Sequence, residues 1–154
     1  MSAEIQSAGI AAEANLSRSL PRVWLDHDQM KQVFINLIKN ALQAMKPGGT
    51  LTVATERAED CVTVSVSDTG AGIPPHLIGR IFEPYESTKK GGSGLGLMIV
   101  RRIVQQHGGA IDVDSVVGKG TVFRLRLPTR EKRARVLEAP PGPAAKQLEA
   151  PEGS

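Results

Sequence analysis

A helical spacing of apolar residues dominates the first third of the chain. From Met30 to Met45, apolar residues recur every three or four positions, which is the spacing of one face of an amphipathic helix. Asp26 or Asp28 offers a side-chain oxygen that can cap the start of this helix. The run Pro47-Gly48-Gly49 ends it. We therefore predict a helix that begins near these aspartates and ends at about Met45.

A period of two predicts strands elsewhere in the chain. Four segments alternate in this way, and residues 10–15 alternate more weakly, as an edge strand would. The four segments are 50–56, 61–67, 110–116 and 121–127. Further helices are predicted over 94–107 and, within a long irregular stretch typical of a lid, over 75–82. This order predicts an α+β fold, a two-layer α/β sandwich: a mixed, mostly antiparallel sheet with helices on one face and a mobile lid.

Composition divides the chain into one body and two ends. Of the 154 residues, 40% are apolar and 23% are charged, which suits one domain with a hydrophobic core. We assign this domain to residues 9–128. From Thr129 onward the chain is rich in charge, Ala and Pro, so we expect a disordered tail or linker over 129–154. Residues 1–8 are expected to be disordered as well.

The bulk properties argue against several kinds of protein. A formal charge of +3 with 3% aromatic residues gives little support for nucleic acid binding. Cys61 is the single cysteine, which precludes an intrachain disulfide and suits the cytoplasm. We see neither a signal peptide nor an apolar run long enough for a membrane span.

Asn36 and Asn40 lie one turn apart at the edge of the apolar stripe of the first predicted helix. Their amide oxygens can ligate Mg²⁺ beside phosphate groups without adding negative charge. Taken alone, the pair fits two solvent-facing polar residues better.

Two glycine-rich segments offer further candidates. Asp68 and the glycines of DTGAGI follow a Val-rich strand, where a carboxylate can accept a hydrogen bond from the adenine amine and the glycines allow close approach to a flat base. GGSGLGL precedes the second predicted helix, whose free N–H groups favour an anion such as phosphate. Taken alone, the first can be an ordinary turn and the second a hinge. Together with the asparagines, the segments predict a site for a nucleotide with a metal.

The same segments resemble the catalytic ATP-binding domain of sensor histidine kinases, in the superfamily shared with gyrase and MutL. NLIKNALQAM is similar to that family's asparagine motif, DTGAGI and GGSGLGL to its glycine motifs, and IFEPYESTK to its phenylalanine motif and lid. RRIVQQHGGAIDVDS and GKGTVF are similar to its closing elements. The similarity extends over residues 9–128 and is strongest to the nitrogen-regulation type of kinase. It implies the Bergerat fold.

The resemblance implies ATP and Mg²⁺ as ligands. Asn40 would ligate Mg²⁺ with Asn36 assisting, and Lys89 would join them in catalysis by reaching the terminal phosphates. The other implied ATP-binding residues are Gln43, Asp68, Gly70, Gly72, Ile73, Phe82, Gly92, Ser93, Gly94, Leu95, Gly96, Leu97 and Thr121.

Within this set, Asp68 would recognise the adenine amine, Thr121 would close the adenine side, and Phe82 would anchor the lid. The sequence also departs from the family. Gln43 stands where many relatives carry a basic residue, and Tyr85-Glu86 replaces an aromatic pair. These departures concern one phosphate contact and the docking of the lid.

The implied activity is transfer of the γ-phosphoryl group to a histidine, with a response regulator as an indirect partner. The related hydrolases carry a glutamate base at the position of Asn36, and an asparagine cannot take a proton from water. Only about 25 residues precede the first predicted helix, too few for the family's phosphoacceptor hairpin. We therefore expect that hairpin on another domain or chain, in cis or in trans, and do not expect His27, His76 or His107 to be the acceptor.

Two alternatives remain open at the level of sequence. One is a serine kinase of the anti-sigma type that phosphorylates a partner protein. The other is a non-catalytic module in which ATP controls an interaction. Acid-labile label on a hairpin would distinguish histidine transfer from both.

Overall fold

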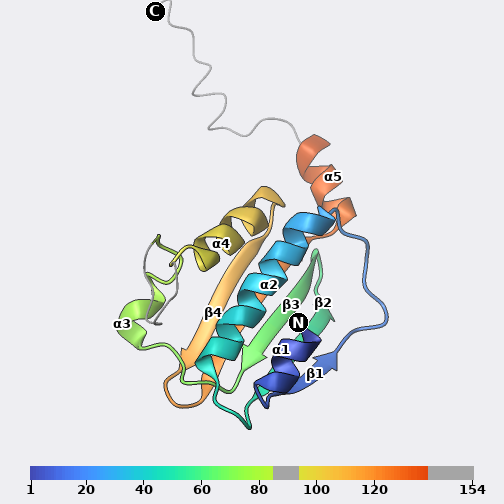
Figure 1. Cartoon of the computed structure of the whole chain (residues 1–154). Coiled ribbons are helices and arrows are strands. Elements are labelled where there is room, and N and C mark those ends of the chain that lie inside the picture. Colours follow the sequence, from blue (N-terminus) through green and yellow to red (C-terminus); the bar gives the residue numbers. More distant parts are fainter. Residues whose placement is uncertain (85–93, 139–154) are drawn as a thin grey trace, which may run out of the picture.

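The computed structural model describes residues 1–84 and 94–138. Five strands form one sheet in the order β1-β2-β3-β5-β4 (Figure 1). The strands are β1 (Ala11–Asn15), β2 (Thr50–Arg57), β3 (Cys61–Asp68), β4 (Ala110–Val116) and β5 (Gly120–Pro128). The helices are α1 (Ser2–Ser7), α2 (His27–Ala44), α3 (Pro75–Ile78), α4 (Gly96–Gln106) and α5 (Arg130–Glu138). No helix in these two ranges has the length and apolar character of a membrane span.

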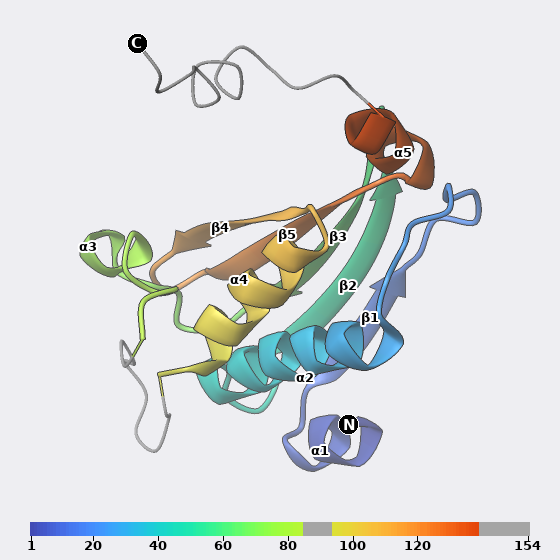
Figure 2. The same ribbon diagram turned by 90° about the horizontal axis from the view of Figure 1, so that it is seen from above.

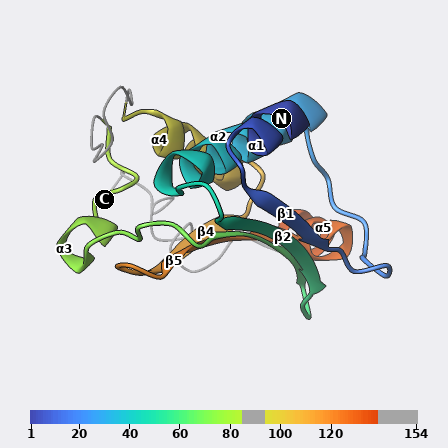
Figure 3. The ribbon, with the colours of Figure 1, turned by 60° about the horizontal axis from the view of Figure 1, so that its bottom comes forward.

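The sheet is mixed because two connections, β1 to β2 and β3 to β4, run through helices, whereas β2–β3 and β4–β5 are hairpins. β1 and β2 are parallel, joined through α2, whereas β2, β3, β5 and β4 pair antiparallel in that order. Figures 2 and 3 show α1, α2 and α4 on the same face of the sheet. The opposite face carries charged cross-strand pairs, Arg124 with Asp114 and Arg126 with Asp112. The predicted two-layer α+β sandwich is therefore confirmed.

The core lies between the sheet and two helices. Val33 and Leu37 of α2 and Val100 and Val104 of α4 are fully buried, as expected from their spacing on one face of each helix. They pack against the alternating inward residues of β3 and β5, among which Leu125 is also fully buried. At the start of α2, the side chain of the N-cap residue Asp26 accepts a hydrogen bond from the N–H of Gln29. The predicted capped helix is thus present.

The chain ends differ from the disordered segments that we expected. Residues Ser2–Ser7 form α1, and Ile5 packs against the core. Residues Arg130–Glu138 form α5, where the Arg130 guanidinium stacks on Trp24 and Arg135 pairs with Asp60. Neither helix has a strong apolar stripe in sequence, and tertiary contacts of this kind stabilise short polar helices. Residues 139–154 lie outside the described ranges, and the boundaries 9–128 stay a prediction.

Candidate functional site

Asp68 lies at the end of β3 and is only 9% exposed. Its Oδ1 accepts a hydrogen bond of 2.8 Å from the N–H of Gly70. The N–H of Ala71 in turn donates to the carbonyl of Ala44, in the last turn of α2. The loop after β3 is thus held between its own carboxylate and the end of α2, and the carboxylate is held in a fixed position at the end of the strand.

Three glycines of this region have no room for a side chain. A Cβ on Gly70 would lie 2.6 Å from the carbonyl oxygen of Ala44. A Cβ on Gly72, which has a φ of +75°, would lie 2.3 Å from the carbonyl oxygen of Val116. A Cβ on Gly120 would lie 1.9 Å from the carbonyl oxygen of Asp68. Close backbone approach, and not only turn formation, therefore requires glycine at these positions.

Thr121 and Ser115 complete this end of the site. Thr121 is 5% exposed and is the register partner of Asp68 in the β3–β5 ladder. Its Oγ1 lies 2.8 Å from the Oγ of Ser115, which also accepts a hydrogen bond from the N–H of Ile73. Sequence analysis included Thr121 and Ile73 but missed Ser115. Ser115 follows Ile111 and Val113 on the inward face of β4. A polar residue at such a position was the feature of the sequence that could have indicated it.

The second end of the site joins α2 to the start of α4. The amide nitrogen of Asn36 donates a hydrogen bond of 3.3 Å to the carbonyl of Gly96, the first residue of α4. The oxygen of Asn36 accepts a hydrogen bond from Gln32. Asn40 is also half-buried, one turn farther along α2. The asparagines thus lie between core and solvent, as their spacing predicted.

The donor chemistry fits Mg²⁺ that enters with a phosphate ligand. In the described ranges, no three or more His, Cys, Asp or Glu side chains form a group able to hold a metal. Asn40 and Asn36 supply neutral amide oxygens, a ligand type that Mg²⁺ accepts together with phosphate oxygens and water. The Asn36 oxygen also accepts the hydrogen bond from Gln32.

The glycine-rich segment before α4 is described from Gly94 onward. Gly94 has a φ of +71°, which glycine adopts without strain. Leu95 is the N-cap residue, and the first helical bond of α4 runs from the N–H of Ile99 to its carbonyl. The first turn therefore directs N–H groups out of the helix end, where an anion is favoured. Leu97 packs against the core.

Lys89, Gly92 and Ser93, together with the departures at Tyr85 and Glu86, lie outside the described residues. Gln43 is exposed on α2.

Phe82 belongs to the short segment between α3 and the expected lid. Its ring contacts the ring of Phe123 edge to face, at a centroid distance of 6.4 Å and an interplanar angle of 77°. The guanidinium of Arg101 lies 5.8 Å from the Phe82 ring centroid. Phe82 is therefore held between Phe123 of β5 and Arg101 of α4.

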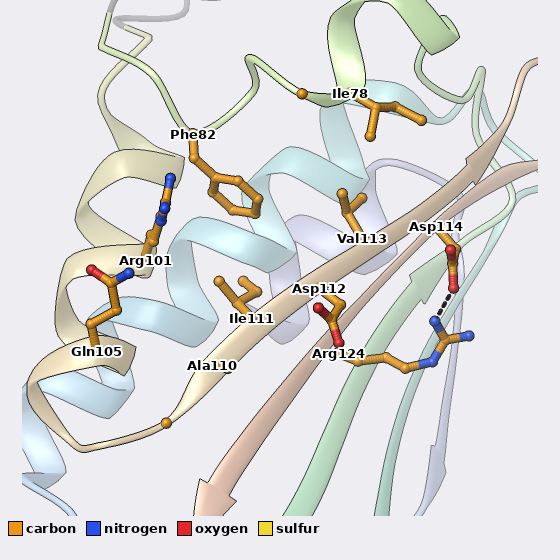
Figure 4. Close-up of a pocket in the computed structure, with 12 residues that line it drawn as sticks. Ile78, Phe82, Arg101, Gln105, Ala110, Ile111, Asp112, Val113, Asp114 and Arg124 are labelled. Atoms are coloured by element: carbon orange, nitrogen blue, oxygen red, sulfur yellow. Dashed lines mark hydrogen bonds and ion pairs between the residues drawn. The ribbon is translucent and has the colours of Figure 1, made fainter. Parts of the chain in front are cut away.

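A separate hollow of about 610 Å³ opens between α3, α4 and β4 (Figure 4). Phe82 and Arg101 border it on one side, and Ile111 and Val113 on the other (Figure 4). Among the predicted site residues of the described ranges, only Phe82 lines it. This hollow is therefore distinct from the region formed by Asp68, the asparagines and the start of α4.

The helix α2 connects the two ends of the site. Asn36, Asn40 and Ala44 follow one another at intervals of four residues, which span roughly 12 Å along the helix axis. Asn36 contacts the start of α4 and Ala44 contacts the loop after Asp68. The helix α2 thus links the start of α4 to the loop that follows Asp68.

Comparison with known proteins identifies the family of this arrangement. The profile of the histidine kinase-, DNA gyrase B- and HSP90-like ATPases matches residues 25–131. Sensor histidine kinase ZraS of Salmonella typhi is 44% identical over 129 residues, which cover 83% of this chain and 28% of ZraS. The chain thus spans about a quarter of that relative.

Solved structures agree with this match. The catalytic domain of histidine kinase ThkA has a TM-score of 0.76 and 36% identity, and the alignment covers 86% of this chain and 88% of that one. Full-length ShkA, solved in complex with AMPPNP, has a TM-score of 0.75 and 32% identity over 83% of this chain and 27% of ShkA. The chain therefore belongs to the family of histidine kinase-, DNA gyrase B- and HSP90-like ATPases.

Proposed function

We propose that this chain binds Mg-ATP and transfers the γ-phosphoryl group to a histidine on a separate phosphoacceptor domain. The observation that carries the proposal is the hydrogen bond between Asn36 and Gly96. This hydrogen bond brings the middle of α2 against the start of α4. The end of α2 holds the loop that follows Asp68. The complex of the relative ShkA with AMPPNP supports an adenine nucleotide as the ligand.

The base end of the proposed site recognises the purine. Asp68 accepts a hydrogen bond from the exocyclic amine of adenine, and its own hydrogen bond from Gly70 holds the carboxylate in place. Gly70 and Gly72 let the loop beside the base pack closely against the carbonyls of Ala44 and Val116. Thr121 closes this side of the pocket, and Ile73 follows the glycines along it.

The phosphate end positions the triphosphate for transfer. Asn40 and Asn36 supply amide oxygens for Mg²⁺, while the N–H groups at the start of α4 face the phosphates. Mg²⁺, when bound, would neutralise phosphate charge. A histidine nitrogen of the partner domain attacks the γ-phosphorus, the bond to the β–γ bridging oxygen breaks, and ADP leaves with the electron pair.

The residue at position 36 favours transfer over hydrolysis. An asparagine amide cannot accept a proton from an attacking water at neutral pH. The attacking nitrogen of a neutral imidazole carries no proton, so no base has to remove one from it during attack. We propose that Lys89, which lies outside the described residues, supplies a cation for the terminal phosphates.

We propose the acceptor and its setting from the relatives. ZraS is a sensor histidine kinase, and ThkA has also been solved with the response regulator protein TrrA. By analogy, the phosphoryl group would pass from the acceptor histidine to a response regulator, in the cytoplasm where ATP is available. The segment NLIKNALQAM favours histidine over serine as the acceptor, and we propose the nitrogen-regulation type within this family from the similarity over residues 9–128.

Nucleotide binding is tested by calorimetry with ATP and Mg²⁺. Asp68→Asn and Asn40→Ala should each weaken ATP binding at least tenfold, because each removes a proposed ligand group. Asp28→Asn and Asn15→Ala make the same chemical changes at exposed positions of α2 and β1 and should leave the affinity unchanged. Unchanged affinity in both site variants would overturn the assignment of these residues.

Phosphoryl transfer is tested with γ-labelled ATP and a separately prepared phosphoacceptor hairpin. Label that is acid-labile and base-stable on the hairpin supports transfer to histidine. Acid-stable label on a partner protein would indicate a serine kinase, and nucleotide binding with no label on any partner would indicate a non-catalytic module. Either of these two outcomes would overturn the proposed acceptor.

A further inference from the structure

The hydroxyl of Ser115 has three hydrogen-bond contacts. Its Oγ lies 3.0 Å from the carbonyl oxygen of Gly120, 2.7 Å from the N–H nitrogen of Ile73 and 2.8 Å from the Oγ1 of Thr121. A serine hydroxyl has one hydrogen to donate and two lone pairs to accept with. Three partners therefore use its full hydrogen-bonding capacity.

Two of the three partners fix which group donates. The carbonyl of Gly120 can only accept, so the hydrogen of Ser115 goes to it. The N–H of Ile73 can only donate, so it occupies one lone pair of Ser115. The second lone pair is left for the hydroxyl hydrogen of Thr121. Thr121 is thereby left with its own lone pairs as the groups it can offer to a ligand.

Thr121 and Asp68 then form a pair of acceptors. They are register partners on β5 and β3, and both are buried on the inner side of the sheet, where directly opposite residues lie about 5 Å apart. The exocyclic amine of adenine has two hydrogens, one for each acceptor. A purine with a carbonyl oxygen at the same position would place an acceptor against two acceptors.

We propose that Ser115 is a positioning residue that sets the preference for a 6-aminopurine by fixing the direction of the Thr121 hydroxyl. This inference rests on the proposed function, since it assumes that the purine lies at Asp68. Ser115 does not itself touch the base. It makes Thr121 an acceptor, and this converts a neutral hydroxyl into a feature that discriminates between an amine and a carbonyl.

The test compares the dissociation constants of ATP and inosine triphosphate, which differ in having an amine or a carbonyl at position 6. In Ser115→Ala, the Thr121 hydroxyl is released and can turn to donate to that carbonyl. The dissociation constant of inosine triphosphate divided by that of ATP should fall about tenfold, which corresponds to roughly one hydrogen bond. Ser65→Ala, on the outward side of β3, serves as the matched control and should leave the ratio unchanged.

The ratio separates positioning from a structural role. Ser115→Ala also removes the acceptor for Ile73, which would weaken both nucleotides by a common factor and cancel in the ratio. If both nucleotides weaken equally, or neither changes, Ser115 does not set the preference. If the unaltered chain binds neither nucleotide, the proposed function fails and this inference fails with it.

A second pair of variants keeps the test independent of how Ser115→Ala folds. Thr121→Val removes the hydroxyl at nearly constant volume and should lower the ratio by a similar factor. Thr121→Ser retains a hydroxyl for Ser115 to orient and should keep the ratio near that of the unaltered chain. Loss of the preference in Thr121→Ser, or its retention in Thr121→Val, would contradict the proposed role.

Discussion

The backbone N–H of Asp26 donates a hydrogen bond of 3.0 Å to the Nε2 of His107. The Nδ1 of the same ring lies 2.8 Å from the carbonyl of Ile103. Since a carbonyl only accepts, Nδ1 carries the hydrogen and Nε2 accepts, so these partners assign a neutral ring. His107, only 8% exposed, thus joins the end of α4 to the start of α2.

This relationship predicts the effect of changing His107 on stability. His107→Leu should reduce the free energy of unfolding by about 1–3 kcal/mol, because the N–H of Asp26 loses its acceptor in a partly buried place. His107→Gln, which has both a donor and an acceptor, should lose less. Urea unfolding followed by circular dichroism measures both, with the exposed His27→Leu as control; equal losses in both His107 variants would argue against the hydrogen bonds.

Gly120 provides a prediction on backbone approach. A Cβ there would meet the carbonyl oxygen of Asp68 at 1.9 Å, and its φ is +139°. Gly120→Ala should therefore destabilise the fold by on the order of 3 kcal/mol, from steric overlap and backbone strain. Gly79→Ala is the matched control, since nothing lies within 4 Å of its Cβ position and its φ is −67°. A thermal melt in which both variants unfold alike would contradict the close approach.

Arg101 and Phe82 provide a prediction on the lid anchor. The stacking of the guanidinium on the ring should contribute about 0.5–1 kcal/mol to stability. A double-mutant cycle with Arg101→Ala and Phe82→Leu should show a coupling energy of about this size in urea unfolding. Arg102, its exposed neighbour on α4, should show no coupling to Phe82 when changed to alanine. Strictly additive effects for Arg101 would mean that the contact contributes nothing.

Trp24 reports on the docking of α5. It is the single tryptophan of the chain and is 56% exposed, with the Arg130 guanidinium 5.0 Å from its ring centroid. Arg130→Ala should make the indole more accessible, so its fluorescence should be quenched more strongly by acrylamide. Arg18→Ala, an exposed arginine in the connection before α2, should leave quenching unchanged. Identical quenching in both variants would contradict the contact.

The order of elements could be predicted from sequence because it depends on local patterns. The helical spacing of apolar residues in α2 follows from the burial of one of its faces against the sheet. The alternation of apolar and polar residues in β3 and β5 follows from their position in the middle of that sheet. Helices α1 and α5 lack such a pattern. Their stability depends on contacts with distant residues, such as that of Arg130 with Trp24, so they were predicted as disordered.

The candidate site stays a prediction, but its residues could be proposed from local segments. Asp68, the glycines and the asparagines stand in recognisable segments; Asn36, in the middle of α2, contacts the start of α4, and Ala44, at its end, contacts the loop after Asp68. Ser115 and His107 act through partners 42 and 81 residues away, Ile73 and Asp26. Their roles depend on hydrogen-bond direction across the fold, which no short segment encodes.

The carbonyl of Ala44 has a consequence for communication within the molecule. The last carbonyls of any helix lack partners within it, and here the N–H of Ala71 supplies one. A ligand that steadies the loop after Asp68 will therefore suppress fraying at the end of α2. Amide hydrogen exchange in that final turn should slow when a ligand fills the site. Ligand binding at the loop after Asp68 would then stabilise the end of α2 against local opening.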